Sequence, residues 1–118
     1  MTQGFDRNLQ VLTAGAFQQL YRQAVSLNVA DPLARLLLRL VLGNAVEFPQ
    51  ARTGLAIPDS LKEYAGLNEN VLLIGQGDYF EIWAPDVWSE QEAELRDVKA
   101  NASRFAALRL GSGRNPSA

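Results

Sequence analysis

Residues 75–88 read GQGDYFEIWAPDVW, and this stretch predicts a turn, a strand and the start of a helix in direct succession. Its first four residues have the glycines and aspartate that tight turns favour, and residues 79–83 alternate in polarity as a half-buried strand does. Pro85 suits the first position of a helix. Because residues 70–74 (NVLLI) form a further apolar run just before the turn, the two runs are expected to pair as a β-hairpin.

The same pattern occurs 71 positions earlier, where residues 4–17 read GFDRNLQVLTAGAF. Apolar positions of the first segment fall on apolar positions of the second: Leu9 on Phe80, Val11 on Ile82, Leu12 on Trp83 and Phe17 on Trp88. Such agreement at a fixed offset indicates an internal duplication. At the same offset, the first copy of residues 48–67 would lie upstream of Met1, so the sequence predicts that the chain begins inside a repeat.

Two helices are expected between the repeats. Residues 17–25 place apolar side chains at helical spacing, and Asp31-Pro32 has the form of an N-cap followed by a first helical residue. An apolar stripe then follows at the spacing of one helix face: Leu33, Leu36, Leu37, Leu40 and Val41. Gly43 is expected to end this helix.

The segment before the second hairpin, residues 48–67, reads FPQARTGLAIPDSLKEYAGL. Residues 45–48 can form a short strand up to Pro49 and residues 55–57 another, so the five polar or small residues between them, 50–54, are expected to be a hairpin corner. Pro58 is expected to begin a short helix that ends at Gly66 and is followed by an apolar contact from Leu67.

Composition excludes several functional classes. The 118 residues contain no cysteine and no histidine, which removes disulfides, thiolate and imidazole metal sites, and the usual general base. No apolar run of about 18 residues is present, and no signal peptide is recognisable at the N-terminus. A cytoplasmic location is therefore expected. The formal charge of −2 gives no general attraction to polyanions, so any nucleic-acid binding must come from a local group of basic residues.

Residues 54–88, GLAIPDSLKEYAGLNENVLLIGQGDYFEIWAPDVW, resemble the C-terminal half of the MraZ family, bacterial repressors of the division and cell-wall gene cluster. GFDRNLQVL at residues 4–12 is similar to the end of the family's first half, and ADPLARLLLRLVLGNA at residues 30–45 is similar to its linking helix. The resemblance implies an α+β fold of AbrB/MraZ-like swapped-hairpin β-barrel modules with packed helices, the first module being incomplete. It also implies a ring-shaped homo-oligomer, nucleoid-associated, that binds repeated boxes in double-stranded promoter DNA, with no cofactor, no membrane and no catalysis.

The resemblance divides the chain into five parts. These are a remnant of the first AbrB-like module (1–17), linking helices (18–44), the second AbrB-like module (45–88), a C-terminal helix (89–110) and a disordered tail (111–118).

The family reads DNA through a hairpin corner with the pattern Asp-x-x-Gly-Arg just ahead of Ile57-Pro58, and this sequence departs from that pattern. Gln50 stands at the position of the aspartate, Thr53 at that of the glycine and Gly54 at that of the arginine. Arg52 lies two positions early. The resemblance thus implies a DNA-binding corner at Arg52, Thr53 and Gly54, with Arg52 as a substitute for the inherited arginine. The alternative is a truncated or diverged MraZ-like assembly module that does not itself bind DNA.

Other polar and aromatic groups have structural interpretations that compete with functional ones. Arg35 and Arg39 form either a basic ridge or a solvated helix face. The basic residues of the C-terminal region can add phosphate contacts or only solvation: Lys99, Arg104, Arg109 and Arg114. A carboxylate site has candidates without a recognisable partner group: Glu90, Glu92, Glu94 and Asp97. The aromatic residues Tyr79, Phe80, Trp83 and Trp88 suit a base-stacking platform or, more simply, packing in a core or an interface.

Overall fold

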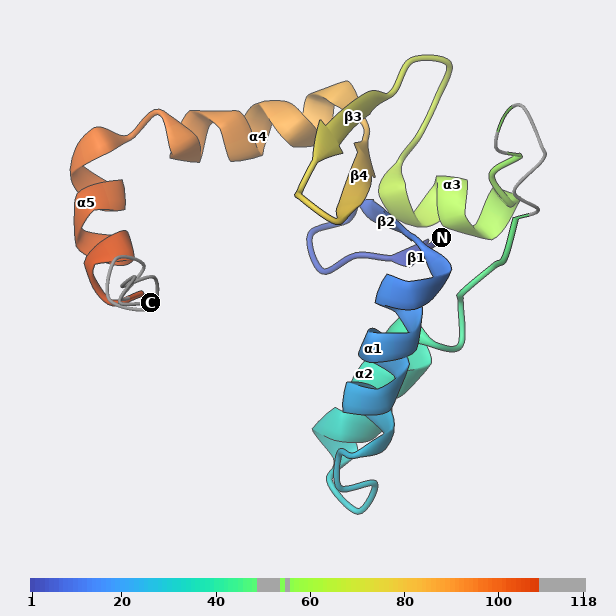
Figure 1. Ribbon diagram of the computed structural model, residues 1–118. Coiled ribbons are helices and arrows are strands. Elements are labelled where there is room, and N and C mark those ends of the chain that lie inside the picture. Colours follow the sequence, from blue (N-terminus) through green and yellow to red (C-terminus); the bar gives the residue numbers. More distant parts are fainter. Residues whose placement is uncertain (49–53, 55, 109–118) are drawn as a thin grey trace. The chain divides into compact units, whose positions relative to one another are not determined.

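The computed structural model describes residues 1–48, 54 and 56–108 of the chain (Figure 1). The chain divides into two compact units, Met1–Val87 and Trp88–Ala118. The first unit contains the whole sheet and three of the helices, while α4 begins in it and continues into the second. Helices and an antiparallel sheet are both present, which confirms the α+β class. Within the described ranges no helix is long and apolar enough to cross a membrane.

Two hairpins meet in one four-stranded sheet. β1 (Thr2–Gln3) pairs with β2 (Leu9–Leu12), and β3 (Leu72–Gly75) pairs with β4 (Tyr79–Trp83). β2 and β4 lie next to each other in the middle, so the strand order is β1-β2-β4-β3 and every pairing is antiparallel. The second hairpin therefore confirms the prediction from residues 70–83.

The register between β2 and β4 places the duplicated segments symmetrically. Leu9 pairs with Ile82 and Val11 pairs with Phe80. Because Leu9 corresponds to Phe80 and Val11 to Ile82 at the offset of 71, exchanging the two copies converts one pair into the other. The two hairpins are thus related by a pseudo-two-fold axis through the middle of the sheet. Helix starts obey the same offset, since α1 begins at Ala14 and α4 at Pro85.

The two hairpin loops differ by one residue. In the first hairpin Gly4 N donates to the Asn8 carbonyl at 2.8 Å across a three-residue loop, in which Arg7 has a positive φ of 59°. In the second hairpin Gln76 N donates to the Tyr79 carbonyl at 2.8 Å across the two-residue loop Gly77-Asp78. Gly77 there has a φ of 88°, which glycine adopts without steric penalty.

α1 (Ala14–Val25) and α2 (Pro32–Val41) follow the first hairpin. Asp31 caps α2 by accepting a hydrogen bond from Leu33 N at 2.9 Å, and Pro32 is the first helical residue, as predicted. Gly43 lies just beyond the helix, where a Cβ would come within 2.6 Å of the Arg39 carbonyl oxygen. The predicted end at Gly43 is therefore confirmed, and close backbone approach explains the glycine.

The apolar stripe predicted for α2 is only partly buried. Ala34 and Val41 are buried, whereas Leu33 is 73% and Leu36 58% exposed. The spacing of the leucines correctly predicted a helix with an apolar face. Within the described residues, however, only part of that face is buried.

α3 (Asp59–Ala65) begins after Pro58, which occupies the N-cap rather than the first helical position. Gly66 ends the helix in the left-handed conformation, with φ 64° and ψ 34°, and Leu67 N donates to the Lys62 carbonyl at 2.9 Å. This is the Schellman arrangement, and it confirms the predicted stop at Gly66 with Leu67 buried after it.

The hairpin predicted around the corner differs from what the structure shows. Residues 45–48, 56 and 57 are not strands, and residue 55 lies outside the described residues. Instead, Val46 exchanges two backbone hydrogen bonds with Met1: Val46 N donates to the Met1 carbonyl at 2.8 Å, and Met1 N donates to the Val46 carbonyl at 2.9 Å. The segment thus adds a single pair beside β1, because its extended backbone finds a partner in the other repeat.

The C-terminal region forms two helices where one was predicted. α4 (Pro85–Leu95) ends before Asp97, whose carboxylate accepts a hydrogen bond from Ala100 N at 3.1 Å and caps α5 (Val98–Ala106). A side chain that caps a new helix competes with continuation of the old one, which explains the break. The predicted tail, residues 111–118, lies outside the described residues.

Candidate nucleic-acid interface

The predicted DNA-binding corner lies partly within the described residues. Arg52 and Thr53 are outside them, and so is Gln50. Gly54 is exposed, has a φ of 155°, and has no heavy atom within 4 Å of the place where a Cβ would stand. Because side-chain-bearing residues rarely adopt this φ, glycine at this position is required by the backbone rather than by lack of space.

Both flanks of the corner are anchored to the first repeat. On the N-terminal side, the pair of hydrogen bonds between Val46 and Met1 fixes the chain beside β1. On the C-terminal side, α3 buries Leu61 and Ala65 almost completely and packs against β1. Tyr64 Oη also donates a hydrogen bond of 2.6 Å to the Gly4 carbonyl. A segment whose two flanks are held by a core is a suitable support for a binding residue.

The basic residues of α2 that were considered as a ridge have different surroundings. Arg35 donates from Nη1 to the Val29 carbonyl at 2.9 Å and to the Ala30 carbonyl at 3.3 Å. Its guanidinium therefore closes the turn between α1 and α2, which supports the structural interpretation. Arg39 is exposed in the last turn of α2, where a cation interacts favourably with the helix dipole.

Two residues of the acidic cluster of the C-terminal region make local contacts. Glu92 Oε1 lies 3.4 Å from Arg96 Nη2 in an exposed ion pair, and Asp97 caps α5. Arg104 likewise donates to Asn101 Oδ1 at 3.2 Å. Among the residues that the structure describes, no group of three or more acidic side chains could hold a metal ion. Arg109 and Arg114 fall outside that part of the chain.

Of the aromatic residues, Trp83 is a core residue. Its side chain is 3% exposed, and Nε1 donates to Glu81 Oε1 at 2.9 Å. Tyr79, Phe80 and Trp88 are partly buried. The indole of Trp83 is therefore not available for stacking on a base, in agreement with the structural interpretation.

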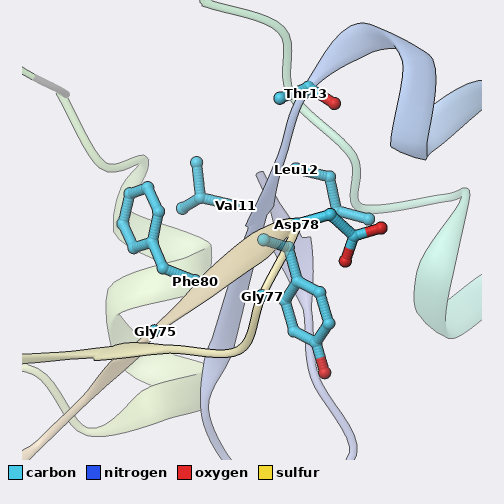
Figure 2. Close-up of a pocket in the computed structure, with 8 residues that line it drawn as sticks. Val11, Leu12, Thr13, Gly75, Gly77, Asp78 and Phe80 are labelled. Carbon is cyan, nitrogen blue, oxygen red and sulfur yellow. The ribbon is translucent and has the colours of Figure 1, made fainter.

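An open hollow of ≈ 360 Å³ lies where β2 ends beside the second hairpin loop (Figure 2). Val11 and Phe80 project from neighbouring strands to the same side of it, and Gly75 and Gly77 form part of its rim. Tyr79 also lines it; burial, followed by the nearby carboxylates of Glu81 and Asp78, raises the pKa of its phenol above the usual 10.0.

Two features of the corner's support were not predicted from the sequence. The hydrogen bond from Tyr64 to Gly4 joins residues 60 positions apart, and local spacing carries no signal of it. Arg7 is exposed at the tip of the first hairpin loop, where its positive φ is accompanied by a hydrogen bond from Asp6 N to Asn8 Oδ1 at 3.2 Å. The turn itself was predicted, because residues 4–17 repeat the turn, strand and helix pattern of residues 75–88; only the conformation of Arg7 was not.

Comparison with known proteins gives a consistent result over most of the chain. Residues 52–109 match the family model described as "MraZ protein, putative antitoxin-like". The protein named "Transcriptional regulator MraZ" from Roseiflexus castenholzii is 36% identical over 107 residues, which cover 90% of this chain and 73% of the relative. Proteins with the same name from Thermomicrobium roseum and Halorhodospira halophila are 36% and 37% identical, covering 92% and 82% of this chain and 78% and 64% of the respective relative. With this identity over this length, the chain belongs to the MraZ family.

Proposed function

We propose that this chain is a transcriptional regulator and not an enzyme, acting by binding double-stranded DNA. The proposal rests on the sequence identity of 36% that this chain shares with proteins named transcriptional regulator MraZ over 90% and 92% of its length. In finer detail, we propose a repressor of the division and cell-wall gene cluster that binds repeated promoter boxes in the cytoplasm, on the nucleoid. The two repeats then correspond to two AbrB-like modules with swapped hairpins, the first of them incomplete.

The DNA-contacting element in this proposal is the corner with Arg52, Thr53 and Gly54. An arginine on an exposed corner can contact phosphates or make a bidentate contact to guanine. The anchored flanks at Val46 and Tyr64 support this role, because they limit the positions from which the guanidinium can reach DNA. Gly54 supports it as well, since this exposed residue lies at a bend of the backbone and has a φ that residues with a side chain rarely adopt.

Assembly is the second part of the proposal, because one arginine in each subunit gives little affinity alone. A homo-oligomeric ring would present Arg52 several times to repeated boxes, and binding through several sites multiplies affinity. Leu33 and Leu36 on α2 support assembly, as both are large apolar side chains that are more than half exposed. Exposed apolar surface of this kind is typical of protein contact regions.

An electrophoretic mobility shift with promoter DNA from the host's own division cluster tests the proposal. The parent is expected to shift this DNA, and Arg52→Ala to weaken the shift strongly. Arg22→Ala is the matched control, because it removes the same charge from an exposed position in the last turn of α1. A parent that binds no promoter DNA, or equal weakening by both substitutions, would contradict the role of the corner.

The second candidate function is an assembly module of the same family that does not bind DNA itself. The altered corner and the net charge of −2 favour it, since both reduce attraction to phosphates. The same mobility shift separates the two candidates when oligomer size is measured in parallel. Assembly without a shift identifies the second candidate.

A further inference from the structure

Two helical pairs of the same construction follow the two hairpins. α1 and α2 come after β2, and α4 and α5 come after β4 (Figure 1). In each pair an aspartate caps the second helix by accepting a hydrogen bond from a backbone N–H, Asp31 in α2 and Asp97 in α5. The two helical pairs are therefore corresponding parts of the two repeats.

The turn inside each pair is closed by a side chain at the same helical position. Arg35, the fourth residue of α2, donates to two carbonyls of the preceding loop at 2.9 Å and 3.3 Å. Asn101, the fourth residue of α5, donates from Nδ2 to the carbonyls of Glu94 and Leu95 at 3.2 Å and 2.9 Å, at the end of α4. Each pair is thus held together at its turn by its own residues.

Most of the exposed large apolar side chains of the described residues belong to these two helical pairs. They are Tyr21, Val25, Leu27, Val29, Leu33 and Leu36 in the first pair, and Leu95, Val98, Phe105 and Leu108 in the second. Within the same part of the chain, the others are Phe5, Val71 and Leu73. Exposed apolar surface gathered in this way is typical of a surface that contacts another protein.

The two helical pairs differ in charge. Within its bounds α2 contains Arg35 and Arg39 and no acidic residue. Within its bounds α4 contains no basic residue and four acidic ones: Asp86, Glu90, Glu92 and Glu94. Because opposite charges attract across an interface and like charges repel, α2 suits α4 better than either helix suits a second copy of itself.

On α2, apolar and basic side chains adjoin on one exposed face. Leu33 and Leu36 are 73% and 58% exposed, and the exposed Arg39 follows Leu36 at the same three-residue spacing. Residues three apart are neighbours on a helix surface. Leu33, Leu36 and Arg39 are named the basic face.

The turn between α4 and α5 has the complementary combination. Glu90 and Glu94 are exposed and lie four residues apart on α4, so they are neighbours on the helix surface. Leu95 and Val98, which are 55% and 80% exposed, follow them at the turn that Asn101 closes. Glu90, Glu94, Leu95 and Val98 are named the acidic face.

α1 and α4 begin at opposite ends of the two central strands. α1 follows the end of β2 at Leu12, which pairs with Tyr79 at the start of β4. α4 follows the end of β4, where Ile82 pairs with Leu9 at the start of β2. The two helical pairs thus leave the sheet from opposite ends, which favours an occupant from a second copy over one from the same chain.

We propose that the basic face of one copy binds the acidic face of a second copy. The leucines of α2 then cover the apolar residues at the turn between α4 and α5, and Arg39 lies beside the carboxylates of α4. Because two different surfaces meet, each added copy leaves one face of each kind for the next, and the contact repeats until the assembly closes. The inference rests on the assembly part of the proposed function and names the surfaces that form it.

A reciprocal exchange of charge tests this contact, with sedimentation velocity of the full chain over a range of concentrations. Arg39→Glu should weaken association about tenfold, because it places a carboxylate against carboxylates. Glu90→Lys combined with Glu94→Lys should weaken it similarly. An equimolar mixture of the two variants should assemble as the parent does, since every contact can then join opposite charges.

Lys62→Glu is the matched control for Arg39→Glu. Lys62 is likewise an exposed cation in the last turn of a helix, and it belongs to neither face. This variant should associate within about threefold of the parent. If it dissociates as much as Arg39→Glu does, or if the mixture stays dissociated while the parent assembles, this contact is wrong and the assembly itself stands. A parent that stays monomeric at every concentration would overturn both.

The apolar part of the contact has its own test. Leu36→Ser should weaken association about tenfold, because less apolar surface leaves water at the interface, and Val98→Ser should act similarly. Phe5→Ser is the matched control, since Phe5 is 62% exposed and lies outside both faces, and it should leave association unchanged. Far-UV circular dichroism checks that each variant keeps its helices. If Leu36→Ser and Phe5→Ser associate equally, the basic face is not buried in the assembly and the proposal is overturned.

Discussion

Gln10 and Glu81 lie directly opposite each other in the pairing of β2 with β4, and they are also corresponding residues of the two repeats. A residue that pairs with its own counterpart marks the position of a symmetry axis, so the pseudo-two-fold axis passes between these two side chains. The duplication in the sequence is therefore a symmetry in space. This relation fixes how the two hairpins are arranged in one sheet.

Because Gln10 lies directly across from Glu81, a negative charge introduced at residue 10 is expected to reduce stability. Gln10→Glu would place two carboxylates directly across the strands and lower the free energy of unfolding by about 0.5 to 1 kcal/mol. In a Glu81→Gln background the same substitution should have almost no effect, because the repulsion is absent. Urea denaturation of the parent, both single variants and the double variant measures this coupling. Equal destabilisation in both backgrounds would contradict the register.

The hydrogen bond from Tyr64 to the Gly4 carbonyl predicts a link between α3 and the first hairpin. Tyr64→Phe keeps the ring and removes the donor, so the free energy of unfolding should fall by about 0.5 to 1.5 kcal/mol. Hydrogen exchange of amides in α3 should accelerate correspondingly. An unchanged urea midpoint would indicate that the hydroxyl is not bonded in solution.

Replacing each of two glycines by alanine is expected to change the stability of the chain in opposite directions. Gly66→Ala puts a Cβ on a residue with a φ of 64° and should destabilise the chain by about 1 kcal/mol. Gly15→Ala lies on an exposed turn of α1 with nothing within 4 Å of the new Cβ, and should stabilise the chain by about 0.5 kcal/mol. Thermal unfolding of both variants against the parent is the measurement, and the same sign for both would contradict the helix boundaries.

Tyr79 predicts a loss of stability in alkaline solution. Burial and the carboxylates of Glu81 and Asp78 raise the pKa of its phenol above 10.0 in the folded state. The folded state thus holds this proton more tightly than the unfolded state. The resulting stability is fully present below about pH 10 and is lost as the pH rises through the folded pKa. Urea unfolding across this range should show a weaker decline for Tyr79→Phe than for the parent; an identical decline would rule out the phenol as its source.

Local patterns in the sequence were sufficient for the elements with strong end signals. Asp31-Pro32 before α2, Gly66 after α3 and the glycine-containing turn of the second hairpin each fix backbone geometry within a few residues. The repeat at an offset of 71 was also visible, because the same alternation of apolar residues must face the core in both copies.

Features that depend on distant partners were not predictable in the same way. Residues 45–48 have strand composition, yet only Val46 pairs with Met1, because the partner strand β1 is two residues long. The leucine stripe on α2 showed a helix but not which leucines would be covered. The break before α5 depends on whether Asp97 caps the new helix. For the candidate site, the corner at Arg52, Thr53 and Gly54 stays a prediction from the sequence, while the anchoring of its flank by Tyr64 required the fold.

The central claim, DNA binding through the corner with Arg52, is tested most directly by the salt dependence of affinity for labelled promoter DNA. Each phosphate contact contributes a slope of about −0.9 to a plot of log affinity against log salt concentration. We expect the parent to bind with a steep slope, Arg52→Ala to bind more weakly with a shallower slope, and Arg22→Ala to resemble the parent. If the parent shows no binding even at low salt, or Arg52→Ala keeps the parent's affinity and slope, the claim is wrong.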